Sequence, residues 1–270
     1  MTILSFIFIF LLGTIIGSFL NVVIYRFNTG RTITKGRSIC MSCSNNLRWY
    51  ELVPVLSFII QCGKCRRCKS PISYQYPLVE FFTGLVFTLI AFKFLPILHI
   101  YSNIYVFFVT FFVFIFSLLI VIFVYDLRHK IIPDKLVYTF IFLSFVSIFI
   151  NFSAMGPLFI YPNVYSLIAG PVISLPFILI WYFSKGKLMG LGDAKLMLGM
   201  GFLLGLSSGI FAVIVSFWIG TIISIPLMLL SKSKMNLKTE IPFAPFLIIC
   251  TFITFLFSFD MFSLIRLFSI

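Results

Sequence analysis

The sequence predicts an all-α polytopic membrane protein with about eight transmembrane helices and a small cytoplasmic loop domain. Of the 270 residues, 61% are hydrophobic and only 10% are charged, and the mean hydropathy is +1.16. Long apolar runs recur along the chain, and one polar segment collects most of the cysteines. An average soluble protein carries about 25% charged residues. Because so few polar side chains could not cover a globule of this size, soluble and disordered classes are excluded.

Eight apolar segments approach the length that spans a bilayer, for which a helix needs about 20 mostly apolar residues. They cover residues 3–24, 77–96, 103–125, 136–153, 163–183, 194–207, 209–230 and 242–265. The sixth segment is short and meets the seventh near Ser207 and Ser208, so seven spans are the alternative count. Gly13 and Gly17 in the first segment are spaced to let another helix approach closely.

Basic residues lie almost entirely on one side of this arrangement. The net charge is +13, and 18 of the 20 Lys and Arg residues fall in or at the edges of the segments 25–76, 126–135, 184–193 and 231–241. Cytoplasmic loops are rich in Lys and Arg, so these segments are predicted to be cytoplasmic and both termini to lie outside. The charge excess then reflects topology, which makes the lipid bilayer a partner and predicts no nucleic acid. The chain divides into a first transmembrane helix (1–24), a loop domain (25–76) and a seven-helix membrane domain (77–270).

Five of the six cysteines lie in the loop domain, at Cys40, Cys43, Cys62, Cys65 and Cys68. Disulfides are rare in a reducing cytoplasm, whereas two C-x-x-C pairs about twenty residues apart are typical of a tetrahedral zinc site. A stretch of about fifty residues has too small a core to fold easily alone, and a structural metal supplies what it lacks. The spacing leaves the second pair open: Cys62 with Cys65 leaves eighteen residues between the pairs, and Cys65 with Cys68 leaves twenty-one.

Cys250 and Glu80 lie inside predicted spans and are expected to have structural roles or to line a cavity. Cys250, in the last span, is expected to be an apolar packing residue. Glu80 lies near the cytoplasmic end of the second span. It is expected to pair with a nearby Arg or Lys, or to line a cavity.

Two of the seven acidic residues, Asp126 and Asp193, lie at the cytoplasmic ends of different spans and at similar depth. A charged side chain costs about 2.5–3.5 kcal/mol at a helix centre and normally faces a protein interior or a water-filled cavity. Two close carboxylates share one proton, so one activates water while the other polarises a carbonyl. The alternative is a pair of unrelated interfacial residues satisfied by Arg128, His129 or Lys195.

Several motifs occur together in a specific order. They are Gly17-Ser18-Phe19-Leu20-Asn21-Val22-Val23, the cysteine loop, Asp126-Leu127 through Ile132-Pro133-Asp134, and Gly190-Leu191-Gly192-Asp193-Ala194-Lys195-Leu196. This combination resembles the bacterial prepilin peptidases (type IV leader peptidases) over about residues 13–246. Ala244, in a segment expected near the active site, departs from the family by replacing a usual glycine.

The resemblance implies an intramembrane aspartyl protease of the bacterial inner membrane whose active site faces the cytoplasm. Such enzymes remove the basic leader from type IV prepilins and pseudopilins by cutting after a glycine. Many also methylate the new N-terminal residue with S-adenosylmethionine as methyl donor. The family's catalytic pair falls on Asp126 and Asp193. Its cysteine pairs, the ligands of a structural Zn2+, fall on the four residues Cys40, Cys43, Cys65 and Cys68 and leave Cys62 over.

Two rival functions are consistent with parts of the sequence. A presenilin-like intramembrane protease would also use Tyr125-Asp126 and Asp193. Such proteases carry a Pro-Ala-Leu element in a late span, which this sequence does not contain, and they lack the cysteine loop. A transporter or channel with a structural zinc loop would need a polar pathway across the membrane midplane. The spans offer few polar residues at that depth.

Overall fold

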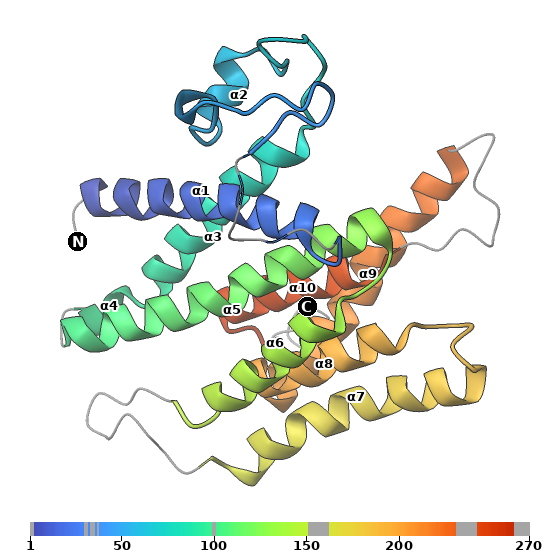
Figure 1. Ribbon diagram of the computed structural model, residues 1–270. Coiled ribbons are helices and arrows are strands. Elements are labelled where there is room, and N and C mark those ends of the chain that lie inside the picture. Colours follow the sequence, from blue (N-terminus) through green and yellow to red (C-terminus); the bar gives the residue numbers. More distant parts are fainter. Residues whose placement is uncertain are drawn as a thin grey trace. The chain divides into compact units, whose positions relative to one another are not determined.

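A computed structural model describes residues 3–29, 32, 36, 38–98, 101–150, 162–230 and 242–261, without the side chains of 227–230. Helices make up most of it (Figure 1). They are α1 (Ile3–Arg26), the 3-10 turn η1 (Trp49–Glu51), α2 (Leu56–Ile60), α3 (Gln75–Lys93), α4 (Leu95–Leu98), α5 (Ser102–His129), α6 (Asp134–Ser147), α7 (Val164–Ser184), α8 (Leu191–Leu204), α9 (Leu206–Leu230) and α10 (Ala244–Phe257). The described residues form only two isolated β-bridges and no strand. The predicted all-α class is therefore confirmed.

The chain divides into two compact units, residues 1–121 and 122–270. The first holds α1 to α4, the cysteine loop and most of α5. The second holds the last residues of α5 and α6 to α10. The three-part division predicted from the sequence separates membrane segments from the loop, whereas these two units are separated by the contacts within the chain. The three-part division therefore stays a prediction.

In the first unit, α1 packs against α3 through glycines. A Cβ atom added at Gly13 would lie 2.7 Å from the Gly84 Cα of α3, and one added at Gly17 would lie 2.7 Å from the Glu80 Cα. No side chain fits at these distances, so the two helices require glycine for their close approach. The expectation drawn from the spacing of Gly13 and Gly17 is confirmed.

In the second unit, α8 lies at the centre and packs against α6, α7, α9 and α10. Close packing again uses glycine: a Cβ atom at Gly201 of α8 would lie 2.6 Å from the Gly170 Cα of α7. The break after α8 falls at Gly205, whose φ is +80°. This is earlier than the break expected near Ser207 and Ser208, because glycine adopts positive φ without steric penalty whereas serine does not.

Five described helices are long and apolar enough to cross a membrane. They are Ile3–Arg26, Gln75–Lys93, Ser102–His129, Val164–Ser184 and Leu206–Pro226. The other three predicted spans correspond to α6, α8 and α10, each of 14 residues. At 1.5 Å per residue such a helix is about 21 Å long, shorter than the hydrocarbon core of about 30 Å. The protein is thus a multi-pass helical protein, and the count of about eight full spans is not confirmed.

Candidate active site and metal centre

Asp126 lies in the last turn of α5, and only 4% of its surface is exposed. The backbone N–H of Ala244, the first residue of α10, donates a hydrogen bond to its carboxylate. The other oxygen, Oδ2, is buried and has no hydrogen-bond partner among the described residues. A buried polar atom without a partner costs about 1–3 kcal/mol. Such a cost in an otherwise packed interior is typical of functional sites.

Asp193 lies in the first turn of α8, which begins after Gly190. Its partly buried carboxylate is close enough to that of Asp126 for the two charges to interact. The positive end of the α8 dipole favours a negative charge at this position. The structure therefore brings together the two carboxylates that the sequence singled out, from helices separated by the whole of α6 and α7.

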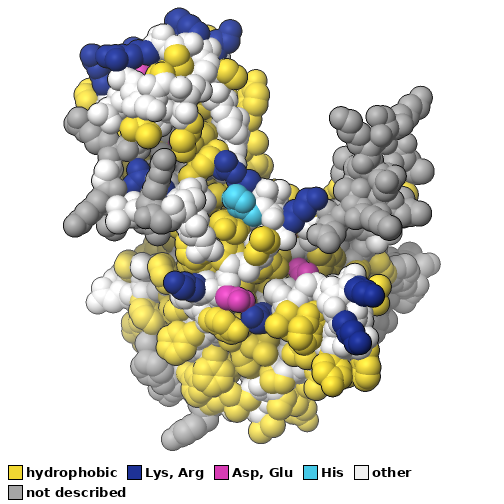
Figure 2. All heavy atoms as spheres, turned by 45° about the vertical axis from the view of Figure 1, so that its right-hand side comes forward, with side chains coloured by type: hydrophobic (Ala, Val, Ile, Leu, Met, Phe, Trp, Pro, Cys, Tyr) yellow, Lys and Arg dark blue, Asp and Glu magenta, His cyan; other side chains and the backbone are white. Residues whose placement is uncertain are grey.

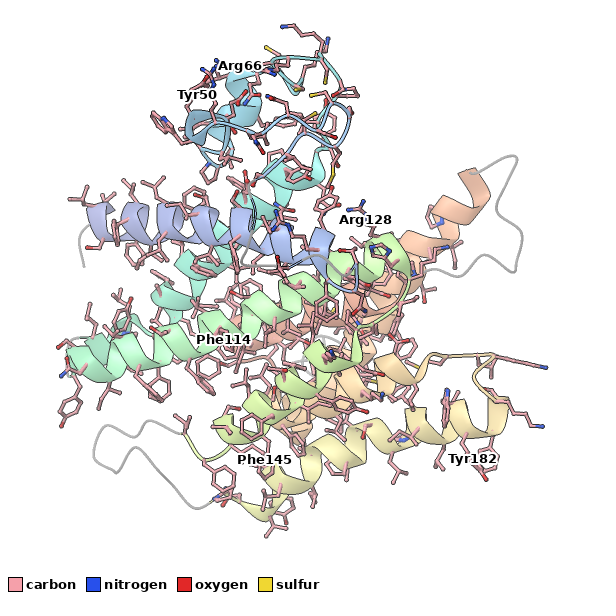
Figure 3. The ribbon with its side chains drawn as sticks, in the orientation of Figure 1. Tyr50, Arg66, Phe114, Arg128, Phe145 and Tyr182 are labelled. Carbon is pink, nitrogen blue, oxygen red and sulfur yellow. The ribbon has the colours of Figure 1, made fainter. Side chains whose placement is uncertain are left out.

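Two of the basic residues that could have paired with these carboxylates, Lys195 and His129, have other contacts. The Lys195 ammonium lies 2.6 Å from Oδ1 of Asp134, in the first turn of α6, and 4.8 Å from the centre of the Tyr138 ring. The His129 ring packs against the Tyr125 ring at 4.5 Å. Figure 3 shows the side chains of this end of α5, with Arg128 labelled. Of the three basic residues in the alternative of two unrelated interfacial aspartates, Lys195 thus pairs with Asp134 instead.

The two glycines before Asp193 have different surroundings. A Cβ atom at Gly192 would lie 2.9 Å from the Ile132 Cβ, so the segment after α5 packs directly on the start of α8. A Cβ atom at Gly190 would meet only Oδ2 of Asp193, at 3.6 Å, and the Gly192 nitrogen, at 4.0 Å. Gly192 is therefore required for packing, while a methyl group at Gly190 would make only ordinary contacts with the described residues.

In the first unit, the ligand atoms of Cys40, Cys43, Cys65 and Cys68 all lie within 4.8 Å of one another. The Cys40 and Cys68 sulfurs are 3.8 Å apart. Four thiolates about 2.3 Å from a zinc ion would lie about 3.8 Å apart in a tetrahedron, so the donor set and its size fit zinc. Cys62 is not part of this group, and the choice that the spacing left open is made by the geometry.

The two cysteine pairs have the same local geometry. Cys40 N–H donates to the Asn45 carbonyl and Cys65 N–H donates to the Ser70 carbonyl, both at 2.9 Å. The residue after the second cysteine of each pair has a positive φ, 54° in the first pair and 60° in the second. One isolated antiparallel bridge closes each loop. Each pair is thus a tight turn that presents two sulfurs on the same side.

Hydrogen bonds to sulfur lower the pKa of two of the four thiols, which favours their thiolate form. The Cys43 backbone N–H lowers the pKa of the Cys40 thiol to about 6. The Ser70 hydroxyl, 3.0 Å from the Cys68 sulfur, lowers the pKa of that thiol, and the Ser70 backbone N–H adds to the effect. For Cys43, the Asn45 backbone N–H acts to lower the pKa, but burial and the thiols of Cys40 and Cys68 raise it to about 11. A bound metal would replace these thiol contacts and deprotonate all four sulfurs.

Exposed basic side chains cover the rim of this cysteine module, residues 38–74. Figure 2 shows Lys and Arg gathered there, and extensive apolar surface over other parts of the protein. The Arg66 guanidinium lies 5.1 Å from the centre of the Tyr50 ring, and both are labelled in Figure 3. The Arg48 guanidinium donates a hydrogen bond to the Tyr50 hydroxyl at 3.0 Å. These contacts tie the segment before η1 to the second cysteine turn.

Glu80, buried in α3, has a backbone partner rather than the basic partner expected from the sequence. Its Oε2 accepts a hydrogen bond from the Val55 N–H at 2.7 Å, and the Ser18 side chain of α1 also contacts it. Val55 adopts φ +61° and ψ −51°, and Leu56 N–H bonds to the Pro54 carbonyl at 2.6 Å. This is a γ-turn, which is rare for a β-branched residue. Glu80 therefore fastens the cysteine module to the paired helices α1 and α3.

Sequence reasoning did not identify the contact between Ala244 and Asp126. Ala244 carries no functional side chain, and its role depends on a backbone N–H at the start of a helix. The available signal was Pro245, because proline in the first turn marks where α10 begins. Cys250 of α10 is buried as expected.

A multi-pass helical protein with two interacting carboxylates and a four-cysteine turn module has the features expected of a membrane-embedded aspartic protease. Residues 11–94 match the bacterial peptidase A24 N-terminal domain, and residues 113–225 match the type IV leader peptidase family. The chain belongs to the type IV leader peptidase family, and so it is an enzyme.

Several relatives bear the name prepilin leader peptidase/N-methyltransferase. The protein from Vibrio cholerae is 32% identical over 206 residues, which cover 72% of this chain and 76% of the relative. That from Bacillus subtilis is 30% identical over 243 residues, covering 90% and 89%. The protein from Myxococcus xanthus is 49% identical over 81 residues, which cover 30% of this chain and 24% of that relative. No solved structure matches the chain.

Proposed function

We propose that this protein is an aspartic endopeptidase that removes the leader peptide from type IV prepilins or pseudopilins by cleaving after a glycine. The observation that carries the proposal is that the buried carboxylate of Asp126 and the partly buried carboxylate of Asp193 lie close enough for their charges to interact. Membership of the type IV leader peptidase family supports the reaction, and the names of the relatives support the substrate.

The geometry supports a division of labour between the two carboxylates. Two adjacent carboxyl groups do not both stay ionised, so the pair holds one proton. The ionised member takes a proton from a water molecule while the protonated member donates a hydrogen bond to the scissile carbonyl. The unpartnered Oδ2 of Asp126 is available for one of these contacts. An extended substrate backbone would pass Asp193 beside Gly190, where an added Cβ atom would make only ordinary contacts with the described residues.

The proposed setting is the inner membrane of a bacterium, with the active site at the cytoplasmic face. The distribution of Lys and Arg supports this orientation. The substrate's apolar helix would lie in the bilayer and present the junction between leader and helix at that face. Cleavage needs this junction to be unwound, because a helical backbone does not expose its carbonyl to the two carboxylates.

We further propose that the enzyme methylates the new N-terminal residue with S-adenosylmethionine, as the relatives' names suggest. The cysteine module is proposed to hold a structural zinc ion through Cys40, Cys43, Cys65 and Cys68. The sulfur geometry supports this assignment. Four thiolates fill the coordination shell, so the metal would organise the module and take no part in hydrolysis.

Mass spectrometry of a prepilin incubated with membranes containing the protein tests both activities. The wild-type protein should remove the leader and add one methyl group to the new N-terminus, while Asp193→Asn should leave the prepilin intact. Asp134→Asn is the matched control, because Asp134 lies close in sequence to Asp126 but is exposed and paired with Lys195. Full cleavage by Asp193→Asn would exclude the proposed mechanism. Leader loss without added methyl would restrict the function to the peptidase.

A further inference from the structure

The start of α10 has one backbone N–H that makes no hydrogen bond within the helix. Its flanking residue, Phe243, accepts hydrogen bonds from the N–H groups of Phe246 at 3.1 Å and Leu247 at 3.3 Å. Pro245 has no N–H. Of the first four residues of the helix, only Ala244 therefore has an N–H outside the helix's own hydrogen bonds, and this N–H interacts with the carboxylate of Asp126.

The surrounding packing holds this donor in place. Ala244 is fully buried. The Phe243 ring packs against the Phe217 ring of α9 at 4.6 Å. A Cβ atom added at Gly220 of α9 would lie 3.4 Å from the Phe246 ring, so α9 contacts the first turn of α10 on both sides of Ala244. A rigid helix start makes its N–H a donor of fixed direction.

We propose that the Ala244 backbone N–H is a positioning donor for the peptidase reaction, which holds one oxygen of Asp126 so that Oδ2 is presented to the reacting water or carbonyl. The inference rests on the proposed function of Asp126. Asp126 lies at the negative end of the α5 dipole, where a carboxylate is disfavoured, and the positive end of α10 offsets this. The hydrogen bond also fixes the carboxylate plane, on which in-line proton transfer depends. Because the donor is backbone, the side chain at this position is free to be alanine.

An amide-to-ester substitution tests the role of the N–H directly. Lactic acid incorporated at position 244 replaces the N–H by oxygen and keeps the methyl side chain. A hydrogen bond to a charged group contributes about 1.5–3 kcal/mol, so kcat for leader cleavage should fall about 10- to 100-fold. KM should stay within about twofold, because Asp126 orientation affects the reaction more than substrate binding.

The matched control is leucic acid at position 247, whose N–H bonds to Phe243 within the helix. It makes the same chemical change in the same turn and should leave kcat within about threefold. Ala244→Pro deletes the same N–H by a different route, since proline is well tolerated at the first helical position, and should lower kcat as the ester does.

The outcomes separate this inference from the function on which it rests. Wild-type kcat in the 244 ester, together with no cleavage by Asp126→Asn, would overturn the positioning role alone. Undiminished cleavage by Asp126→Asn would overturn the proposed function itself. If the 244 and 247 esters lost kcat to the same extent, loss of any backbone hydrogen bond at the start of α10 would explain the effect. That result would also overturn the inference. Thermal unfolding of each variant in detergent identifies a loss that comes from misfolding.

Discussion

In the cysteine module, each pair of sulfurs comes from four consecutive residues, whereas Asp126 and Asp193 come from helices α5 and α8 with all of α6 and α7 between them. The cysteine turns obtain their shape from local hydrogen bonds and one positive φ each. The aspartate pair obtains its shape from packing between helices, which depends on Gly192 against Ile132 and on the start of α10. We therefore expect that the cysteine module can be changed without affecting the aspartate pair. The aspartate pair should respond to substitutions in several helices.

The largest expected effect separates the two sites. Asp126→Asn keeps the shape of the side chain but removes the acid and base, so leader cleavage should fall by about 10³-fold or more. The metal content of the purified protein should not change, since the cysteine module lies in the other unit. Elemental analysis beside a cleavage assay checks both statements. A variant that loses its zinc together with activity would show that the two sites are coupled.

The reverse experiment removes a metal ligand. Cys40→Ser should abolish stoichiometric zinc, because structural zinc sites contribute on the order of 10 kcal/mol to folding through all four ligands. Methylation and resistance of residues 38–74 to proteolysis should be lost, while leader cleavage falls by less than about tenfold. Cys62→Ser is the control, because this cysteine lies outside the cluster, and it should retain the metal. Intact methylation in Cys40→Ser would contradict this division of labour.

The two glycines before Asp193 sharpen the contrast between packing and chemistry. Gly192→Ala brings a methyl group to 2.9 Å from the Ile132 Cβ and should destabilise the protein by about 1–3 kcal/mol. Gly190→Ala brings one to 3.6 Å from Oδ2 of Asp193, an ordinary contact, so stability should be unchanged. Its methyl group fills space that the substrate backbone would use, and kcat/KM should fall. Thermal unfolding and cleavage rates of both variants test this, and equal stability losses would show that Gly190 is a packing residue too.

The same contrast explains what the sequence could predict. The candidate cysteine ligands lie in motifs whose spacing is a direct consequence of their geometry. The spacing alone left Cys62 and Cys68 as alternatives, the family resemblance implied Cys68, and the clustering of the four sulfurs agrees with it. Asp126 and Asp193 were identified because carboxylates are rare in an apolar chain, while their contact follows from the packing of α8. The contacts of the Ala244 and Val55 N–H groups were not predicted, since a backbone donor leaves no mark on residue identity, although Pro245 marks the start of the helix that carries Ala244. The count of about eight spans is not confirmed among the described residues, because hydropathy does not show where a helix ends inside an apolar run.

The smallest expected effect concerns the attachment of the cysteine module to its helices. Glu80→Ala leaves the Val55 N–H without its acceptor in a buried position, which should lower the free energy of unfolding by about 1–2 kcal/mol. Alanine at this position keeps the close approach of α1, because the Gly17 contact is with the Glu80 Cα. Glu51→Ala is the matched control: Glu51 also accepts a backbone hydrogen bond, from Arg48 N–H at 2.8 Å, but in an exposed turn where water can replace it. Its effect should be about half as large or less. Denaturant titrations of the two variants measure the difference, and equal losses would mean that burial of Glu80 adds nothing to its hold on the strained turn at Val55.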